Sequence, residues 1–241
     1  MRALRPVTMP VTQEPGQPDA GSTIRQDHQR RDHAPATEAP NLAWTFPRRH
    51  LERMTIGTVF DVGVSKGTRE LYAAFPDAYY VLVEPLRENL PDLDAILERH
   101  RGEYVLAAAG AESGRATLNV EPARRGMSSL LDRKSGTATG DEVERREVPV
   151  VTLDEISGSR DLPRPYGVKI DTEGFELEVV RGAGRTLRET VFVIAETSTR
   201  RRFDGGYRAI DLFAELRRHG FVPFDLLRST KRFVDVLFMR P

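Results

Sequence analysis

The stretch Thr58–Thr68 limits the possible folds of this 241-residue chain more than any other. It opens with the mostly apolar run Thr58-Val-Phe-Asp-Val, typical of a short buried strand, and has glycine at positions 63 and 67. A turn built on glycine lets a ligand approach the backbone closely. In open α/β sheets such turns lie at the carboxyl ends of strands, where ligands bind. The stretch therefore predicts a strand, a ligand-binding turn and the start of a helix.

Strand-like and helix-like segments alternate after this turn, as in a parallel sheet covered by helices on both faces. We expect strands over Thr58–Gly63, Tyr79–Glu84, Glu103–Ala109, Arg115–Val120, Glu147–Val151, Tyr166–Asp171 and Val191–Glu196. Helices are expected over Thr68–Phe75, Arg87–Arg101, Thr152–Ile156, Phe175–Leu187 and Tyr207–His219. The last two strands, Phe221–Leu227 and Phe233–Met239, predict a C-terminal antiparallel hairpin on an otherwise parallel α/β sheet.

Two segments do not follow this alternation. Residues 1–44 are rich in Pro, Gln, Thr, Asp and Arg and cannot bury enough apolar surface to offset the entropy of ordering. We predict a disordered N-terminal arm over 1–44 and a folded domain over 45–241, with a short helix near Trp44. The second segment, Gly110–Gly140, is a long, polar and glycine-containing interruption after Pro122. Such long loops are often functional lids or disordered segments, and we interpret this one as a lid or as disordered.

Composition excludes several classes of function. Lys and Arg total 36, as do Asp and Glu, so no general attraction to nucleic acid or to an anionic membrane is expected. The absence of cysteine excludes disulfides and thiolate chemistry, and the five histidines are too dispersed for a metal site. No apolar run approaches the ~20 residues of a membrane span, and no secretory signal is evident. We expect a soluble, cytoplasmic protein without a metal.

The glycine turn lacks the fingerprint of a nicotinamide dinucleotide site. The second glycine of Gly-x-Gly-x-x-Gly lets the backbone approach a pyrophosphate, and Ser65 occupies that position here. S-adenosylmethionine carries an amino acid, a sulfonium and an adenosine but no phosphate, so the turn is compatible with it. Gly63 would give its amino-acid end close access, and Asp61 would interact with its ammonium group, directly or through water.

Glu84 adds evidence for an adenosine ligand. It ends the second expected strand and is followed at once by Pro85. A carboxylate at this strand tip can accept hydrogen bonds from both ribose hydroxyls of adenosine. NAD would make the same contact, so Glu84 does not choose between the two ligands. We also include Ala108, from the strand expected over Glu103–Ala109, among the cofactor contacts.

A third stretch, Val168–Ala183, places carboxylates at the same edge of the sheet, because its strand ends in Asp171, Glu173 and Gly174. With this stretch the chain resembles the FkbM-type S-adenosylmethionine-dependent methyltransferases over about residues 56–240. The matching motifs are Asp61-Val-Gly63 with Gly67, Val83-Glu84-Pro85, Met127-Ser-Ser-Leu130, Thr152-Leu-Asp-Glu-Ile156, Lys169-Ile-Asp-Thr-Glu-Gly-Phe-Glu176, Arg181-Gly-Ala183 and Ile194-Ala-Glu196.

The resemblance implies a seven-stranded class I methyltransferase fold and, as the usual reaction, O-methylation of a hydroxyl on a sugar or secondary metabolite. It carries over Asp61, Gly63, Gly67 and Glu84 as contacts to S-adenosylmethionine. The family's turn commonly reads Asp-Val-Gly-Ala-Asn-x-Gly, so Val64-Ser65 replaces Ala-Asn here. Ser65 keeps a hydrogen-bonding group with a shorter reach than asparagine, and we include it among the cofactor contacts. Lys66 is expected to point to solvent, because it would repel a sulfonium.

Methyl transfer to an alcohol requires alignment and removal of the alcohol's proton. The candidate bases are Asp171, Glu173 and Glu196, all expected at or just beyond strand tips. Asp171 is the first choice for placing the acceptor or the methionine end of the cofactor. Glu173 has an alternative role in fixing the turn at Gly174, and Glu196 has one in pairing with Arg200.

The expected partner is a small acceptor, anionic or glycosylated. Two groups of arginines, Arg124-Arg125 and Arg200-Arg201-Arg202, would hold its carboxylate or phosphate. The alternative is that both groups lie in solvated loops and bind no ligand. Two other functions stay open. A nicotinamide-dependent oxidoreductase would share the sheet, although Ser65 and the lack of a Tyr-x-x-x-Lys pair count against it. A catalytically silent module that binds an adenosine ligand is the other. The sequence does not indicate an oligomeric state.

Overall fold

The computed structural model describes residues 51, 54–134, 142–198, 200–230 and 233–241. The predicted disordered arm and most of the helix expected near Trp44 lie outside these residues. Leu51 and Ile56, two apolar residues from that region, are buried. They pack in the same apolar cluster as Leu71 and Tyr80 and so contribute to the core of the folded domain.

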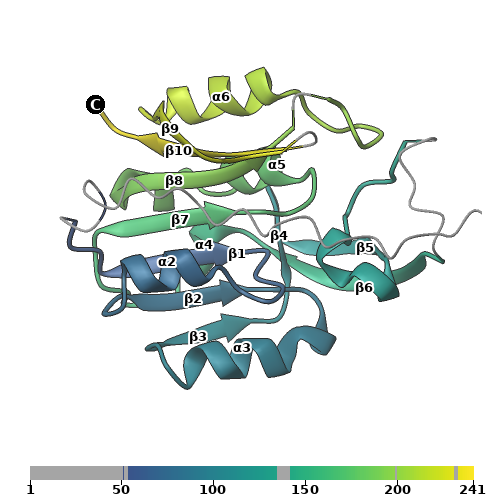
Figure 1. The fold of residues 1–241 in the computed structure, drawn as a ribbon, viewed down its shortest axis with the longest axis horizontal. Coiled ribbons are helices and arrows are strands. Elements are labelled where there is room, and N and C mark those ends of the chain that lie inside the picture. The colour runs from purple at the N-terminus through teal and green to yellow at the C-terminus, as the bar shows by residue number, and fades with distance from the viewer. Residues whose placement is uncertain (1–50, 52–53, 135–141, 199, 231–232) are drawn as a thin grey trace, which may run out of the picture. The chain divides into compact units, whose positions relative to one another are not determined.

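The main sheet has seven strands in the order β3-β2-β1-β7-β8-β10-β9 (Figure 1). Their bounds are β1 Thr58–Val62, β2 Tyr79–Val83, β3 Gly102–Val105, β7 Tyr166–Ile170, β8 Thr190–Thr197, β9 Val222–Ser229 and β10 Val234–Met239. All pairings are parallel except those of β10 with β8 and β9. The predicted antiparallel hairpin at the end of a parallel sheet is therefore confirmed. The strand order reverses between β1 and β7, which is where open α/β sheets bind ligands.

Helices cover both faces of this sheet, as the alternation predicts. They are α2 Arg69–Ala74, α3 Leu90–Leu97, α4 Leu153–Gly158, α5 Glu176–Arg181 and α6 Ala209–Arg218, with 3-10 turns η1 Arg87–Asn89, η2 Pro122–Met127 and η3 Thr186–Glu189. Apolar residues of α4, α5 and α6 belong to one buried cluster, and those of α2 and α3 belong to another. The central strands β1 and β7 between them are buried along their whole length, so the core lies on both sides of the sheet.

The helix expected over Phe175–Leu187 is wrong in its extent. α5 ends at Arg181, and a separate 3-10 turn, η3, follows it. At Gly182 the backbone passes so close to the chain at Gly110 that an added Cβ would lie 2.0 Å from the Gly110 carbonyl oxygen. The helix ends where this close approach to a segment distant in sequence turns the chain.

The single strand expected over Glu103–Ala109 is also wrong. A tight turn, in which the Ala107 amide donates to the Val105 carbonyl at 3.0 Å, divides it into β3 and β4 Ala108–Ala109. β4 pairs with β6 Glu144–Val151, which pairs with β5 Gly114–Val120 in a second, three-stranded sheet. Figure 1 shows this sheet beside the end of the main sheet toward which β1, β2 and β7 point.

The predicted lid segment contains more structure than a loop. Residues 114–120 form β5 and residues 122–127 form η2, while residues 135–141 lie outside the described chain. The small sheet has its own apolar cluster, which includes Leu118 and Val148 and also Leu86 from the loop after β2. Among the described residues, no helix has both the length and the apolar character that crossing a bilayer requires.

Candidate active site

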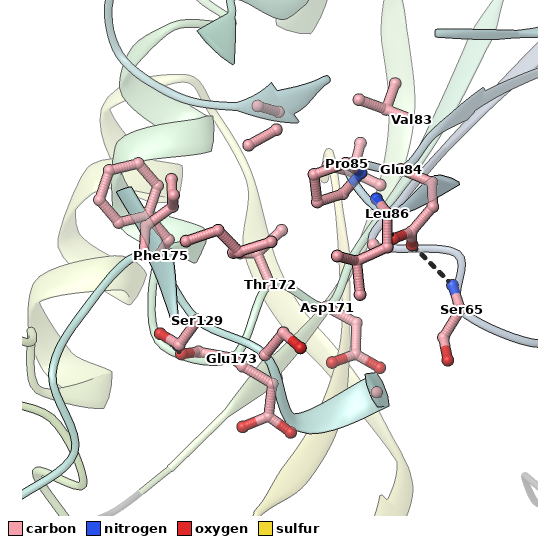
Figure 2. A pocket seen from close by; sticks show the side chains of 18 of the residues that line it. Ser65, Val83, Glu84, Pro85, Leu86, Ser129, Asp171, Thr172, Glu173 and Phe175 are labelled. Carbon is pink, nitrogen blue, oxygen red and sulfur yellow. Dashed lines mark hydrogen bonds between the residues drawn. The ribbon is translucent and has the colours of Figure 1, made fainter. Parts of the chain in front are cut away.

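A cavity of about 550 Å³, counting the space at its open mouth, lies at the carboxyl ends of β1, β2 and β7 (Figure 2). Six residues predicted for the site line it: Gly63, Ser65, Glu84, Ala108, Asp171 and Glu173. Three others, Asp61, Gly67 and Glu196, are not among its lining residues. The fold therefore brings the strand tips together as expected, while three of the nine candidates lie outside the cavity wall.

Gly63 is required where the turn after β1 packs against the end of β7. Its φ is +76°, and an added Cβ would lie 1.8 Å from the Asp171 carbonyl oxygen. Gly67 also has a positive φ, +83°, but its Cβ would contact Ile96 and Tyr72 at 2.8 and 2.9 Å. Gly67 thus lets the turn pack on α2 and α3 and does not face the cavity. Lys66 is exposed, as expected.

Glu84 is the buried acceptor that organises the cavity on the β2 side. Its Oε2 accepts a hydrogen bond from the Ser65 amide at 2.9 Å, and its Oε1 accepts one from the Leu86 amide at 3.0 Å (Figure 2). Burial raises the pKa of the Glu84 carboxyl group, and these hydrogen bonds oppose the shift. Glu84 therefore fixes Ser65, whose φ of +48° is unusual for a residue other than glycine.

Asp61 is fully buried behind the turn and is paired with Lys169 of β7. The Lys169 Nζ lies 3.2 Å from Asp61 Oδ1, and the Tyr72 hydroxyl donates to Asp61 Oδ2 at 2.5 Å. The same Nζ donates to the Gly63 carbonyl oxygen at 3.0 Å and lies 3.7 Å from Asp171 Oδ2. Burial alone would lower the pKa of Lys169, but Asp61 and Asp171 raise it above its ordinary value. One ammonium group thus joins the glycine turn to the tip of β7.

The turn after β7 is held by Glu176, a residue that the sequence motif contains but to which sequence reasoning gave no role. The Glu176 carboxylate accepts hydrogen bonds from the amides of Thr172, at 2.9 Å, and Gly174, at 3.1 Å. The Tyr207 hydroxyl donates to it at 2.7 Å. Glu173, between those amides, has a φ of +51°. The spacing Asp-x-Glu-Gly-x-Glu therefore encodes a tight turn around a buried carboxylate.

Glu173 belongs to a chain of ion pairs that spans distant segments. It contacts Arg202 Nη2 in a short hydrogen bond and lies 3.6 Å from Arg133 Nη2. Arg202 Nη2 is also 3.7 Å from Glu196 Oε1, and Arg228 Nη2 is 3.7 Å from Glu196 Oε2. Glu196 therefore pairs with Arg202 and Arg228 rather than with Arg200, the alternative partner that the sequence suggested. Arg202 is engaged by carboxylates of the protein, so it does not suit the expected grip on an acceptor anion.

Burial raises the pKa of both carboxyl groups in this chain of ion pairs, those of Glu173 and Glu196. For Glu173 the pKa rises to about 7, because burial and Asp171 outweigh the opposing effect of Arg202 and Arg133. For Glu196 the pKa is also raised, first by burial and then by the neighbouring carboxylates. Glu173 lines the cavity, whereas Glu196 lines a smaller hollow beside Tyr207. Glu173 is thus the member of the pair that can meet a ligand in the cavity.

Of the three acidic side chains that line the cavity, that of Asp171 is the most exposed and has the fewest described polar contacts with the rest of the protein. Its side chain is 30% exposed, against 12% for Glu173 and 4% for the whole of Glu84. Its one described ion pair is the 3.7 Å contact with Lys169. A carboxylate in this position is free to accept hydrogen bonds from a ligand.

The cavity wall has the chemistry that S-adenosylmethionine requires. Apolar groups of Leu86, Leu118 and Phe175 provide surface for a flat ring, and the acidic side chains suit its positive ammonium and sulfonium. The hydroxyl oxygens of Ser128 and Thr172 are buried in this wall and have no hydrogen-bond partner in the described chain. Since buried polar atoms are normally paired, these two indicate a polar ligand. The described residues contain no cluster of three or more metal-ligating side chains.

The strand order, with an antiparallel β10 and a cavity where the order reverses, defines the class I methyltransferase fold. A family model described as the methyltransferase FkbM domain matches residues 61–223. The chain therefore belongs to the FkbM methyltransferase family, as its motifs indicate. The family's methyl donor is S-adenosylmethionine, so the predicted cofactor is confirmed. Membership decides against the nicotinamide-dependent oxidoreductase.

Individual relatives are more distant. The chain is 28% identical over 141 residues to the hexuronic acid methyltransferase AglP of Haloferax volcanii, a match that covers 57% of this chain and 54% of that protein. It thus spans about half the length of this relative. Among solved structures, it is similar to magnesium protoporphyrin IX methyltransferase from Synechocystis PCC 6803, at a TM-score of 0.44 and 9% identity over 80% of this chain and 74% of that chain. It is also similar to EvdMO1, at a TM-score of 0.39 and 13% identity over 77% of this chain and 37% of that chain.

Proposed function

We propose that this methyltransferase transfers the methyl group of S-adenosylmethionine to a hydroxyl oxygen of a small acceptor. The observation that carries the proposal is Asp171, which lines the cavity and has the most exposed of its acidic side chains. An alcohol must lose its proton as its oxygen is methylated, and a carboxylate beside it can accept that proton.

In this proposal Gly63, Ser65, Glu84 and Ala108 hold the cofactor, since they line the cavity together. Asp61 and Gly67 support the turn from behind, through Lys169 and α3 respectively. When bound, S-adenosylmethionine supplies an electrophilic methyl group on a positively charged sulfur, which needs no acid to leave. The work left to the protein is alignment of the acceptor and removal of one proton.

Asp171 aligns the acceptor hydroxyl and takes its proton on a carboxylate oxygen as the new C–O bond forms. Lys169, 3.7 Å away, orients this carboxylate. Glu173 is the second candidate, because a pKa of about 7 suits a base at neutral pH. Its carboxylate is, however, engaged by Arg202 and Arg133. Glu196 acts indirectly, by holding Arg202 against Glu173.

For the acceptor we propose a hydroxylated, anionic sugar of the uronic acid class. The similarity to a hexuronic acid methyltransferase supports this class. The cavity supports it as well, since it combines the apolar surface of Leu118 and Phe175 with several hydrogen-bonding groups. A sugar ring presents both kinds of surface.

The test is incubation of the protein with deuteromethyl S-adenosylmethionine and a panel of hexuronic acids, neutral hexoses and their glycosides, with detection of the labelled product by mass spectrometry. Analysis of the product locates the methyl group on oxygen, nitrogen or carbon. Labelling of nitrogen or carbon would refute O-methylation. Binding of S-adenosylhomocysteine without methylation of any acceptor would favour a catalytically silent module.

Asp171→Asn tests the role of the proposed base. We expect turnover to fall by ~10²–10⁴-fold, the usual contribution of a general base, with a much smaller change in S-adenosylhomocysteine affinity. Glu147→Gln is the matched control, because the Glu147 side chain is 70% exposed on β6. Normal turnover in Asp171→Asn would transfer the role to Glu173, and loss of cofactor affinity alone would make Asp171 a cofactor contact.

A further inference from the structure

The cavity is lined by three acidic side chains and, among the described residues, by one cationic side chain. The acidic side chains are those of Glu84, Asp171 and Glu173, and the cationic one is that of Arg125 from η2. The sequence places Arg125 in a group of arginines, with Arg124 and Arg200–Arg202, that is expected to grip an acceptor anion. Arg202 is paired with Glu173 and Glu196, and Arg200 and Arg201 line other hollows. Of that group, only Arg125 lines the cavity.

Arg125 also has no acidic partner among the described residues. In the described part of the chain its guanidinium group makes no ion pair and no hydrogen bond. One carboxylate that it influences, on Glu88, is hydrogen-bonded to Arg146. That hydrogen bond is the main cause of the lowered pKa of Glu88, to which Arg125 makes the smallest contribution. The donors of Arg125 therefore remain available to a ligand.

The backbone around Arg125 is fixed at three points. Asn119 and Ser129 close the loop by exchanging backbone hydrogen bonds of 2.8 and 3.0 Å. Arg133 donates to the Met127 carbonyl at 2.7 Å. At the tip, an added Cβ on Gly126 would lie 3.1 Å from Ser65 Oγ, so η2 lies against the glycine turn. This anchoring holds Arg125 at the side of the cavity that Ser65 also lines.

We propose that Arg125 is the carboxylate-binding residue of this cavity. Guanidinium binds carboxylate through two parallel hydrogen bonds, which gives it both strength and orientation. The inference rests on the proposed function, because that reaction provides two sources of carboxylate: the methionine end of the cofactor and an acidic acceptor. It also explains how a cavity with three acidic side chains accepts a ligand that bears a negative group.

The experiment uses the full chain and compares Arg125→Gln with Arg124→Gln, the adjacent exposed arginine that does not line the cavity. The first arm measures affinity for S-adenosylhomocysteine and for 5′-methylthioadenosine, which lacks the amino-acid end. The second arm measures, with S-adenosylhomocysteine present, affinity for 4-nitrophenyl β-D-glucuronide and for 4-nitrophenyl β-D-glucoside, which differ at the carboxylate. Arg125→Lys, which keeps the charge but loses the two-pronged geometry, is included in both arms.

In one arm, we expect Arg125→Gln to lower the affinity for the carboxylate-bearing ligand by roughly tenfold or more, the equivalent of one charge-assisted hydrogen bond. The affinity for the carboxylate-free counterpart should be unchanged. An effect in the first arm assigns Arg125 to the cofactor, and an effect in the second assigns it to the acceptor. Arg125→Lys should fall between Arg125→Gln and the unaltered protein.

Equal losses for both members of each pair, or no loss in either arm, would overturn the inference. If S-adenosylhomocysteine binds the unaltered protein while neither arm responds to Arg125→Gln, this inference fails and the proposed function survives. If S-adenosylhomocysteine does not bind at all, both the inference and the proposed function fail.

Discussion

The two sides of the cavity hold their acidic side chains by different means. On the β2 side, both oxygens of Glu84 accept backbone amides, one of them from a residue only two positions away. On the β8 side, Glu173 and Glu196 are held by Arg133, Arg202 and Arg228, which come from distant segments. The amide hydrogen bonds oppose the rise in pKa that burial gives Glu84, whereas burial and the neighbouring Asp171 raise the pKa of Glu173 to about 7. The second side should therefore respond more strongly to pH near neutrality.

Lys169 lies between these two sides, and its removal gives the largest expected effect. Lys169→Met leaves the buried Asp61 carboxylate without a counter-ion, which typically costs about 3–5 kcal/mol of unfolding free energy. Urea denaturation measures the loss. Arg115→Met is the matched control, because its partner Glu147 is 70% exposed and such pairs contribute only about 0–1 kcal/mol. Addition of Asp61→Asn to Lys169→Met should recover part of the stability, and no recovery would mean that Lys169 supports the fold by packing.

Glu84→Ala tests the side held by backbone amides. The change removes the acceptor for the Ser65 and Leu86 amides and the proposed acceptor for the ribose hydroxyls. We expect affinity for S-adenosylhomocysteine to fall by ~2–4 kcal/mol, taking roughly 1.5–3 for each hydrogen bond to a charged group and allowing for replacement by water. Isothermal titration calorimetry measures this affinity. Glu84→Gln, which keeps one acceptor oxygen, should lose less, and an unchanged Kd in Glu84→Ala would remove Glu84 from the cofactor site.

Glu173 tests the side held by ion pairs, through pH. Its pKa rises from 4.5 to about 7 on folding, so the folded protein binds this proton more tightly than the unfolded chain does. The resulting stability is complete below about pH 4.5 and is lost as the pH rises through about 7. We expect the unfolding free energy to fall across this window by up to roughly 3 kcal/mol more than in Glu173→Gln. Parallel pH profiles for the two proteins would contradict the shift.

The same contrast explains what the sequence can predict. The tips of β1, β2 and β7, and the place of Glu84 among them, follow from short motifs and from the rule that parallel strands end at one edge. The division of the strand at Ala107 and the end of α5 at Gly182 depend on contacts with β6 and with Gly110, which no local pattern encodes.

Two individual residues show the same limit. Gly67 looks like a ligand-binding glycine in sequence, yet its close neighbours are Ile96 and Tyr72. Glu196 has an arginine four positions away in sequence, but its partners are Arg202 and Arg228. The tertiary structure determines which of several arginines a long carboxylate side chain contacts, and spacing along the sequence does not predict that contact.

The small three-stranded sheet has a consequence for how this protein can diversify. Arg125 and Ser128, which face the cavity, follow β5 of this sheet, and most of its apolar cluster comes from its own strands. Substitutions at Arg125 and Ser128 therefore alter the cavity wall while leaving the two apolar clusters of the seven-stranded sheet unchanged. Under the proposed function, a lineage can change its ligand preference at these two positions without rebuilding the main sheet, and the same positions offer an engineer a place to redesign the cavity.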